Sequence, residues 1–217
     1  MLIIEGGQFL SIAGGIDEEN PADAQSVYIR MKGGNVRGSI YGAAAFAAAS
    51  GDRKFVITGG KVHGWVAGGC NGTDDNQSGG TLASDTYLYI GGNAEINSDG
   101  STTPINISLG GNVFGAGSGN ANQPVTGQVN STNVIIADDA FVERNVYGGG
   151  NLGYSLETAN VTVKGGKVFG KVFGGSNQKQ GNEVVVTMTG GMVREGGFGG
   201  SNVTGTISGN VTMNILG

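Results

Sequence analysis

The sequence predicts an all-β protein in which a parallel β-helix, or β-solenoid, runs through the whole chain. A unit of about 26 residues recurs along the 217 residues, and no segment of similar length shows a helical period. Within each unit, short β-branched runs alternate with polar residues, and glycine pairs follow the runs. Repeats of this length and content are typical of coils that stack on one another into a continuous core.

The clearest copy of the unit spans residues 161–177 and reads VTVKGGKVFGKVFGGSN. Its first four residues alternate valine with a polar residue, which indicates a strand with one buried face. The pair Gly165-Gly166 then turns the chain. Two further short segments, 167–169 and 171–173, are separated by Gly170. The unit therefore predicts three short strands that are joined by glycine corners.

Other copies of the unit predict about seven coils, wound right-handed as parallel crossovers almost always are. They lie at 27–42, 55–71, 134–151 and 184–202. In the copy at 134–151, Asp138-Asp139 replaces the first glycine pair. The region 87–120 is longer than one unit and holds pieces of two, so its register is left open.

Two kinds of side chain recur at fixed places in the unit and are predicted to stack as columns along the solenoid. Stacked aromatic rings and asparagine amide ladders stabilise parallel stacks of strands, whose spacing is about 4.8 Å. The aromatic column comprises Tyr41, Phe114, Tyr147, Phe173 and Phe198, and the asparagine column comprises Asn71, Asn151, Asn177 and Asn202. The side chains of Asn177 and Asn202 are expected to point inward at a corner and to hydrogen-bond backbone groups of their own and adjacent coils, because an amide both donates and accepts.

Composition bounds the domain organisation and the partners. One repeat through the whole chain predicts a single elongated domain, 1–217, in which 45 glycines serve the corners. With 13% charged residues and a net charge of −5, the chain has no basic stripe, so nucleic acid is not expected as a partner.

Membrane insertion is not expected either, because the longest apolar run, 41–49, is short and rich in alanine. Residues 43–50 are the only segment with helix propensity.

Cysteine and histidine offer little chemistry. Cys70 is alone, so an intrachain disulfide is excluded, and it occupies a small-residue position that favours a packing role. His63 is the only histidine, and we interpret it as a surface or packing residue. One histidine and one cysteine do not make a usual zinc site or a catalytic triad. We therefore predict no cofactor, no metal and no catalytic residues.

Acidic and polar turns are the remaining candidates for a site. The pairs Asp74-Asp75 and Asp138-Asp139 could serve as general acid and base or as calcium ligands, but solvated turns are the favoured interpretation. The polar loops 71–84, 98–104 and 118–130 are expected on one edge of the solenoid, where repeat proteins often bind ligands. The candidate ligand-facing residues in these loops are Asp74, Asp75, Asn76 and Asp99.

The two ends of the sequence resemble interior coils. Residues 1–7 already form a strand and a corner, and residues 211–217 stop as another corner begins. Neither end carries the cap that shields the open end of a solenoid. We interpret the chain as a piece of a longer repeat protein, or alternatively as one whose ends are covered by partner subunits. In either case, the chain on its own is expected to associate end to end.

The recurring unit Gly-Gly-x-Val followed by Val-Phe/Tyr-Gly-Gly-Gly/Ser-Asn resembles the glycine-rich repeats of adhesin-like parallel β-helix proteins of the bacterial cell surface. It resembles autotransporter passenger domains more loosely. The resemblance covers nearly the whole chain and implies export and an extracellular, cell-surface location. It implies flanking repeats of a parent protein as partners, and it names no ligand.

Two functions remain. The favoured one is a non-enzymatic structural or adhesive segment, which acts as a stalk or binds a glycan or a host protein. The alternative is a polysaccharide lyase or hydrolase, which requires carboxylates and basic residues on one sheet face. Lys61, Lys164, Lys167 and Lys171 are expected to point outward, but no acidic residue recurs near them in the repeat.

Overall fold

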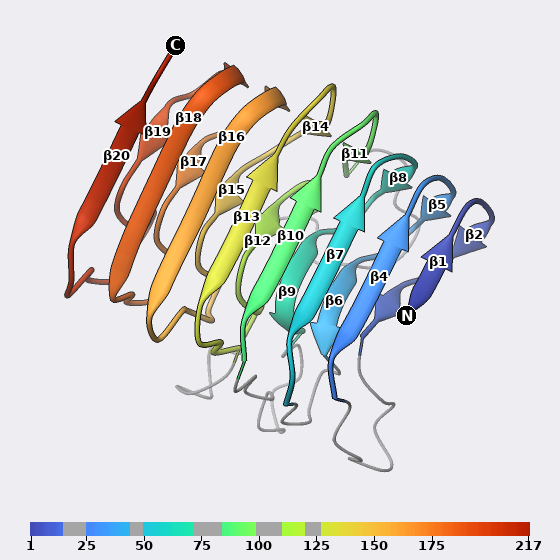
Figure 1. Cartoon of the computed structure of the whole chain (residues 1–217), viewed down its shortest axis with the longest axis horizontal. Helices are drawn as coiled ribbons and strands as arrows, with labels where there is room; N and C mark the ends of the chain where they lie inside the picture. The colour runs from blue at the N-terminus through green and yellow to red at the C-terminus, as the bar shows by residue number, and fades with distance from the viewer. Residues whose placement is uncertain (15–24, 44–49, 72–83, 99–109, 120–126) are drawn as a thin grey trace.

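The computed structural model describes residues 1–14, 25–43, 50–71, 84–98, 110–119 and 127–217. These residues form 20 strands, and none of them lies in a helix. All strand pairs are parallel, and Figure 1 shows the strands side by side in chain order along the long axis. The predicted parallel β-solenoid is therefore confirmed.

Each coil has three faces, and the longest strands form the first. Its eight strands follow one another along the axis as β1, β4, β7, β10, β13, β16, β18 and β20. Their bounds are β1 (Leu2–Ile4), β4 (Val27–Met31), β7 (Arg53–Ile57), β10 (Thr86–Ile90), β13 (Thr132–Ile136), β16 (Thr158–Val168), β18 (Glu183–Val193) and β20 (Val211–Ile215).

The second face is built from two-residue strands that follow the first corner. They are β2 (Gln8–Phe9), β5 (Asn35–Val36), β8 (Lys61–Val62), β11 (Glu95–Ile96) and β14 (Phe141–Val142). The row continues into the last residues of β16, because Val168 pairs with Val142 and with Val193 of β18. In these two coils the strand therefore runs through the corner without a break.

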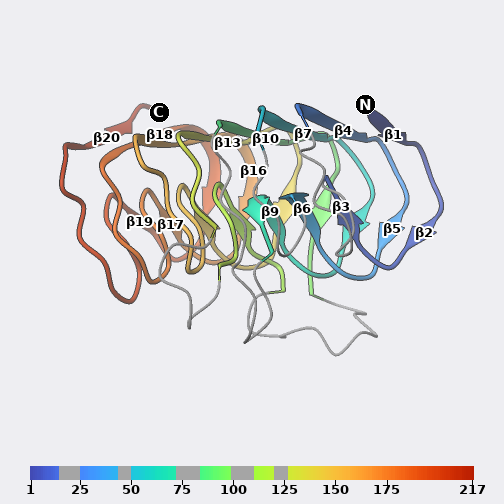
Figure 2. The same cartoon turned by 90° about the horizontal axis from the view of Figure 1, so that it is seen from below.

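The third face lies across the core from the first, as Figure 2 shows. Its strands are β3 (Ile12–Ala13), β6 (Ile40–Ala43), β9 (Val66–Cys70), β12 (Val113–Phe114), β15 (Val146–Tyr147), β17 (Val172–Phe173) and β19 (Gly197–Phe198). These seven strands occur once per coil, so the chain completes six turns between β3 and β19, in agreement with the prediction of about seven coils.

The coil length follows from the register. Leu2 pairs with Ile29, 27 residues on, and Val161 pairs with Val186, 25 residues on. The inward residues of all three faces form one continuous hydrophobic core, in which Ile29, Leu88 and Val161 belong to the same column. Alternation of valine and isoleucine with polar residues thus produces the buried column, because successive side chains of a strand point to opposite sides.

The region 87–120 is a single coil, so the prediction that it holds pieces of two was wrong. Its strand β10 pairs directly with β7 before it and with β13 after it. Leu88 and Val134 are neighbours in the sheet although they are 46 residues apart in sequence. The extra length is insertion rather than an additional coil.

The insertions do not all enter the coil at the same place, which corrects a second expectation. Residues 15–24, 44–49, 72–83 and 120–126 each connect a third-face strand to the next first-face strand. Residues 99–109 instead connect β11 of the second face to β12 of the third. The predicted ligand-facing residues Asp74, Asp75, Asn76 and Asp99, and the segment with helix propensity beyond Ala43, lie outside the described residues.

Candidate functional site

The outer side of the third face carries the aromatic column. Val113, Val146 and Val172 point into the hydrophobic core, so the residue after each points outward. Phe114, Tyr147, Phe173 and Phe198 stack with ring centroids 5.0, 5.1 and 5.2 Å apart and interplanar angles of 10° to 19°. The first three rings are buried, whereas Phe198 is 43% exposed.

Tyr41 belongs to the same column but is separated from Phe114 by Ala67, which pairs with both. Trp65 lies two residues before Ala67 and packs into the same cluster as Phe114. The indole of Trp65 therefore packs in the same cluster as Ala67, where the aromatic column lacks a ring. The sequence pattern did not reveal this substitution, because Trp65 falls outside the strand.

The asparagine column joins amides of consecutive coils. Asn177 Nδ2 donates to Asn151 Oδ1 at 2.7 Å, and Asn202 Nδ2 donates to Asn177 Oδ1 at 2.9 Å. We expected the side chains of Asn177 and Asn202 to point inward and to bond to the backbone. That expectation was wrong: the two amides bond to neighbouring side chains, Asn177 is half-buried and Asn202 is exposed.

Asn71 does not adjoin the other three asparagines. Phe114 pairs with Ala67 on one side and Tyr147 on the other, so Ser118 is the equivalent of both Asn71 and Asn151. This serine is buried and separates the two asparagines. The amide ladder therefore comprises Asn151, Asn177 and Asn202.

The hydroxyl of Tyr147 connects the two columns. It accepts from Asn145 Nδ2 at 2.9 Å and from Asn202 Nδ2 at 3.3 Å, and it donates to Asn177 Oδ1 at 3.4 Å. Burial raises the pKa of Tyr147, although the hydrogen bonds from Asn145 and Asn202 act in the opposite direction. The hydroxyl thus stays protonated at neutral pH and holds three coils together. In the sequence, the only indication of these hydroxyl contacts is that Tyr147 stands at a position where the neighbouring coils carry phenylalanine.

A second polar column was not predicted from the sequence. Arg53 is fully buried, and its Nε donates to the carbonyl of Gly42 at 2.7 Å. In later coils, Thr86 donates to Gly115 O at 2.7 Å and Thr132 donates to Gly148 O at 2.6 Å. The three residues pair with one another at the start of the first face. They anchor the glycine corner that ends the third face.

Asp138 is a turn residue, in line with the favoured interpretation of its acidic pair. It adopts a φ of 54°, close to the 55° of Gly92 in the preceding coil. Its Oδ2 accepts from Gly92 N and from the Tyr89 hydroxyl, each at 2.8 Å. The Gly92 N–H, followed by the Tyr89 hydroxyl, lowers the pKa of Asp138 below its ordinary value. The carboxylate therefore fastens two corners together.

Two of the outward lysines have acidic neighbours, contrary to the expectation from the repeat. Lys61 Nζ lies 2.7 Å from Glu95 Oε2 in the next coil, and Lys164 is close enough to Asp138 to lower the pKa of that carboxyl. Alignment of the repeat units within the sequence does not reveal either contact, because the two partners lie in adjacent coils and at different positions of the unit.

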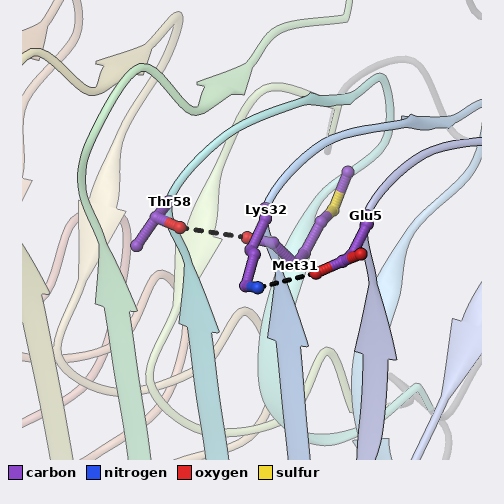
Figure 3. A network of polar contacts seen from close by, with 4 residues as sticks. All are labelled: Glu5, Met31, Lys32 and Thr58. Carbon is purple, nitrogen blue, oxygen red and sulfur yellow. Dashed lines mark hydrogen bonds and ion pairs between the residues drawn. The ribbon is translucent and has the colours of Figure 1, made fainter.

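Side chains also connect the first corners of neighbouring coils, as Figure 3 shows. Lys32 Nζ lies 2.6 Å from Glu5 Oε1, and the Thr58 hydroxyl donates to the Met31 carbonyl at 3.4 Å. The contact with Lys32 lowers the pKa of Glu5. Each of these contacts spans one coil step, so the polar surface reinforces the stacking of the core.

Cys70 and His63 are both buried. Burial raises the pKa of the Cys70 thiol to about 12, so the thiol is neutral and unreactive at physiological pH. In the part of the chain that the structure describes, no three His, Cys, Asp or Glu residues gather as metal ligands would. The same part contains no helix of the length and apolar character that a membrane span needs.

Comparison with protein-family models, with curated proteins and with solved structures finds no match for this chain. The resemblance to glycine-rich surface repeats remains a prediction from the sequence unit. The candidate site is the outer side of the third face, where the aromatic column and the amide ladder lie next to each other.

Proposed function

We propose that the chain is a non-enzymatic structural or adhesive segment of an extracellular bacterial surface protein. In this role it acts as a stalk or presents its outer faces to a glycan or protein ligand. Flanking repeats of a parent protein would be its neighbours. No cofactor is required for either role.

The observation that supports this proposal most strongly is the continuity of contacts along the axis. Backbone pairing links every coil to the next, and the ring stack and amide ladder of the third face run parallel to it. The hydrophobic core and the backbone pairing hold each coil to its neighbours, and the ring stack from Phe114 to Phe198 and the amide ladder from Asn151 to Asn202 add to them in the later coils. Such a rod suits a protein that must hold a fixed distance or display a surface.

A polysaccharide lyase or hydrolase has no specific support among the described residues. The outward residues that pair along the middle of the first face include Arg30 and Lys54 but no Asp or Glu. Elsewhere, the carboxylate of Glu95 is bound by Lys61, and that of Asp138 serves a corner.

The distinguishing experiment measures binding and turnover in the same sample. The purified chain is immobilised and incubated with neutral and uronic-acid polysaccharides and with matrix proteins, and the retained polymer and the newly formed reducing or unsaturated sugar ends are quantified over time. We expect retention of a ligand or no interaction, but no new chain ends. Product that increases with time and with protein concentration would contradict the proposal.

A further inference from the structure

The outer side of the first face carries tyrosine rings and cations in the interior coils. Strands β4, β7, β10, β13 and β16 lie side by side there, as Figure 1 shows. Successive side chains of a strand alternate between the core and the solvent, so the outward residues form columns along the axis. One column in the middle of this face comprises Tyr28, Lys54, Tyr87, Asn133 and Asn160.

Lys54 is held in place by the tyrosines of the coils before and after it. Its Nζ lies 5.7 Å from the centre of the Tyr28 ring and 5.2 Å from that of the Tyr87 ring. The ring quadrupole attracts the ammonium group, which still has three hydrogen-bond donors. Lys54 is exposed, whereas both tyrosines are half-buried. The cation is therefore oriented before a ligand arrives, which lowers the entropy cost of binding.

Lys54 and Arg30 have no carboxylate partner among the residues that the structure describes. Arg30 lies in the adjacent outward column, one coil before Val56, and is exposed. It is near Glu5, but Lys32 binds that carboxylate at 2.6 Å. The two cations therefore remain open to a ligand.

The carboxylates closest to Lys54 along the chain serve the stacking of the coils. Asp52 lies two residues before Lys54, and its Oδ1 accepts from Asp85 N at 3.4 Å. Asp85 Oδ1 in turn accepts from Ser131 N at 3.1 Å. These acids are directed toward the backbone of the following coil at the start of the strands. The middle of the face thus presents positive charge, and its complement is an anionic group.

The hydrogen bonding of the face favours a polysaccharide over a peptide. Both edges of β7 and β10 are paired with neighbouring coils, so an extended peptide cannot add a strand there. Recognition depends on side chains alone. The amide of Asn133 continues the column of Lys54 and can both donate to and accept from hydroxyl groups. The tyrosines combine an apolar ring with a polar hydroxyl, which suits sugar rings that carry hydroxyl groups.

We propose that the outer side of the first face binds an acidic polysaccharide that carries carboxylates on its sugar units. Lys54 and Arg30 contact the carboxylates, and Tyr28, Tyr87 and Asn133 contact the sugars. The backbone positions of the two cations are about 8 Å apart, since they are separated by one coil and by two residues along the strand. One extended polymer chain can therefore reach both. This inference rests on the proposed adhesive role and assigns a ligand class and a face to it.

The first test compares two polymers that differ only in charge. Polygalacturonate carries a carboxylate on every sugar unit, and its fully methyl-esterified form is the matched neutral polymer. Calorimetry at low ionic strength measures the dissociation constant of each for the full chain. We expect polygalacturonate to bind about tenfold more tightly than the ester, because two charge contacts are lost in the ester. Equal binding of the two polymers, or no binding of polygalacturonate, would overturn the proposal.

The second test locates the contact on the first face. Lys54→Gln and Arg30→Gln each remove one cation, and Lys167→Gln removes the same charge from an exposed position of the second face. Circular dichroism and melting temperature verify that the variants fold as the unmodified chain does. We expect K54Q and R30Q each to raise the dissociation constant about two- to fivefold, and K167Q to leave it unchanged. An equal loss in K167Q would mean that the whole chain attracts the polymer, and the proposal would fail.

The same samples separate this inference from the proposed function. New sugar ends formed from polygalacturonate would contradict the non-enzymatic role, even where Lys54 and Arg30 are needed for binding. Retention of polygalacturonate that K54Q and R30Q leave unchanged would overturn the first-face site but not the adhesive role. Poly-glutamate carries the same charge on a peptide backbone and should bind more weakly than polygalacturonate. Tighter binding of poly-glutamate would assign the face to an acidic protein instead.

Discussion

Gly174 shows why a particular glycine is required at the end of the third face. Its φ is not in the left-handed region, so flexibility is not the reason. A Cβ at this position would collide with the Val184 side chain and lie 2.9 Å from the Gly199 carbonyl. Gly148 and Gly115 occupy the same column, and a Cβ there would meet the carbonyl of the following coil. Close approach of neighbouring coils therefore excludes a side chain.

We expect Gly174→Val to destabilise the chain by about 1 to 3 kcal/mol or more, since overpacking of a buried site that cannot relax has this cost. The free energy of unfolding, measured by urea titration, tests this. Gly200→Val is the matched control, because a Cβ at Gly200 meets nothing within 4 Å. Equal destabilisation by the two substitutions would mean that close approach is not the reason for the glycine.

Cys70 predicts a specific pH dependence of stability. Burial raises its pKa from 9.0 to about 12 in the folded chain. The contribution of the neutral thiol to the free energy of unfolding is therefore fully present below pH 9 and is lost as the pH rises toward 12. The reason is that the Cys70 thiol loses its proton at a lower pH in the unfolded chain than in the folded one. At a pH of about 10.5, which is about 1.5 pH units above the pKa of the unfolded thiol, the loss of stability is about 2 kcal/mol.

Cys70→Ala isolates this effect from the buried tyrosines. Unfolding free energies at neutral pH and at a pH of about 10.5 are compared for both chains, and the unmodified chain should lose about 2 kcal/mol more than the variant. The constant cost of the cavity cancels in this comparison. Identical pH profiles would show that the thiol is not desolvated as described.

On the scale of the elements, the amide ladder ties β15, β17 and β19 together through the turns that follow them. Asn177→Leu should cost about 1 to 3 kcal/mol, because it leaves the Oδ1 of the buried Asn151 without its donor. It also removes the acceptor of Asn202 and of the Tyr147 hydroxyl.

Gln178→Leu provides the control for this prediction, since it exchanges a neighbouring, exposed amide for the same apolar residue. Thermal unfolding followed by circular dichroism compares the two variants. We expect a lower melting temperature for N177L than for Q178L. A melting temperature of N177L at or above that of Q178L would contradict a stabilising role for the ladder.

The strands and corners were predictable because each coil repeats the same local pattern. Alternating valines indicated the first-face strands, and the glycine pairs indicated the corner at Gly165-Gly166. The direction of the asparagine side chains was not predictable, because one period does not specify which side of a turn faces the core. Contacts such as that of Arg53 with Gly42 were missed for a related reason: they join different positions of neighbouring coils.

For the molecule as a whole, the period of the sequence predicted the solenoid, but it did not predict where the insertions enter each coil. A long insertion between β11 and β12 made one coil resemble two, because glycine pairs also occur at its flanks, Gly91-Gly92 and Gly110-Gly111. Spatial pairing of β10 with both β7 and β13 resolves the ambiguity. The candidate loop residues Asp74 and Asp99 remain predictions.

The register between coils makes the length of this protein adjustable in whole steps. Val161 and Val186 stand one above the other in the same column, as do their neighbours on all three faces. Removing residues 162–186 would join two equivalent points of the path and leave every column with one member fewer. The solenoid can therefore gain or lose one coil, which is about 4.8 Å of length, through duplication or deletion of a segment of its gene, and the packing of the remaining coils stays the same. The length of the molecule is therefore set by the number of its coils.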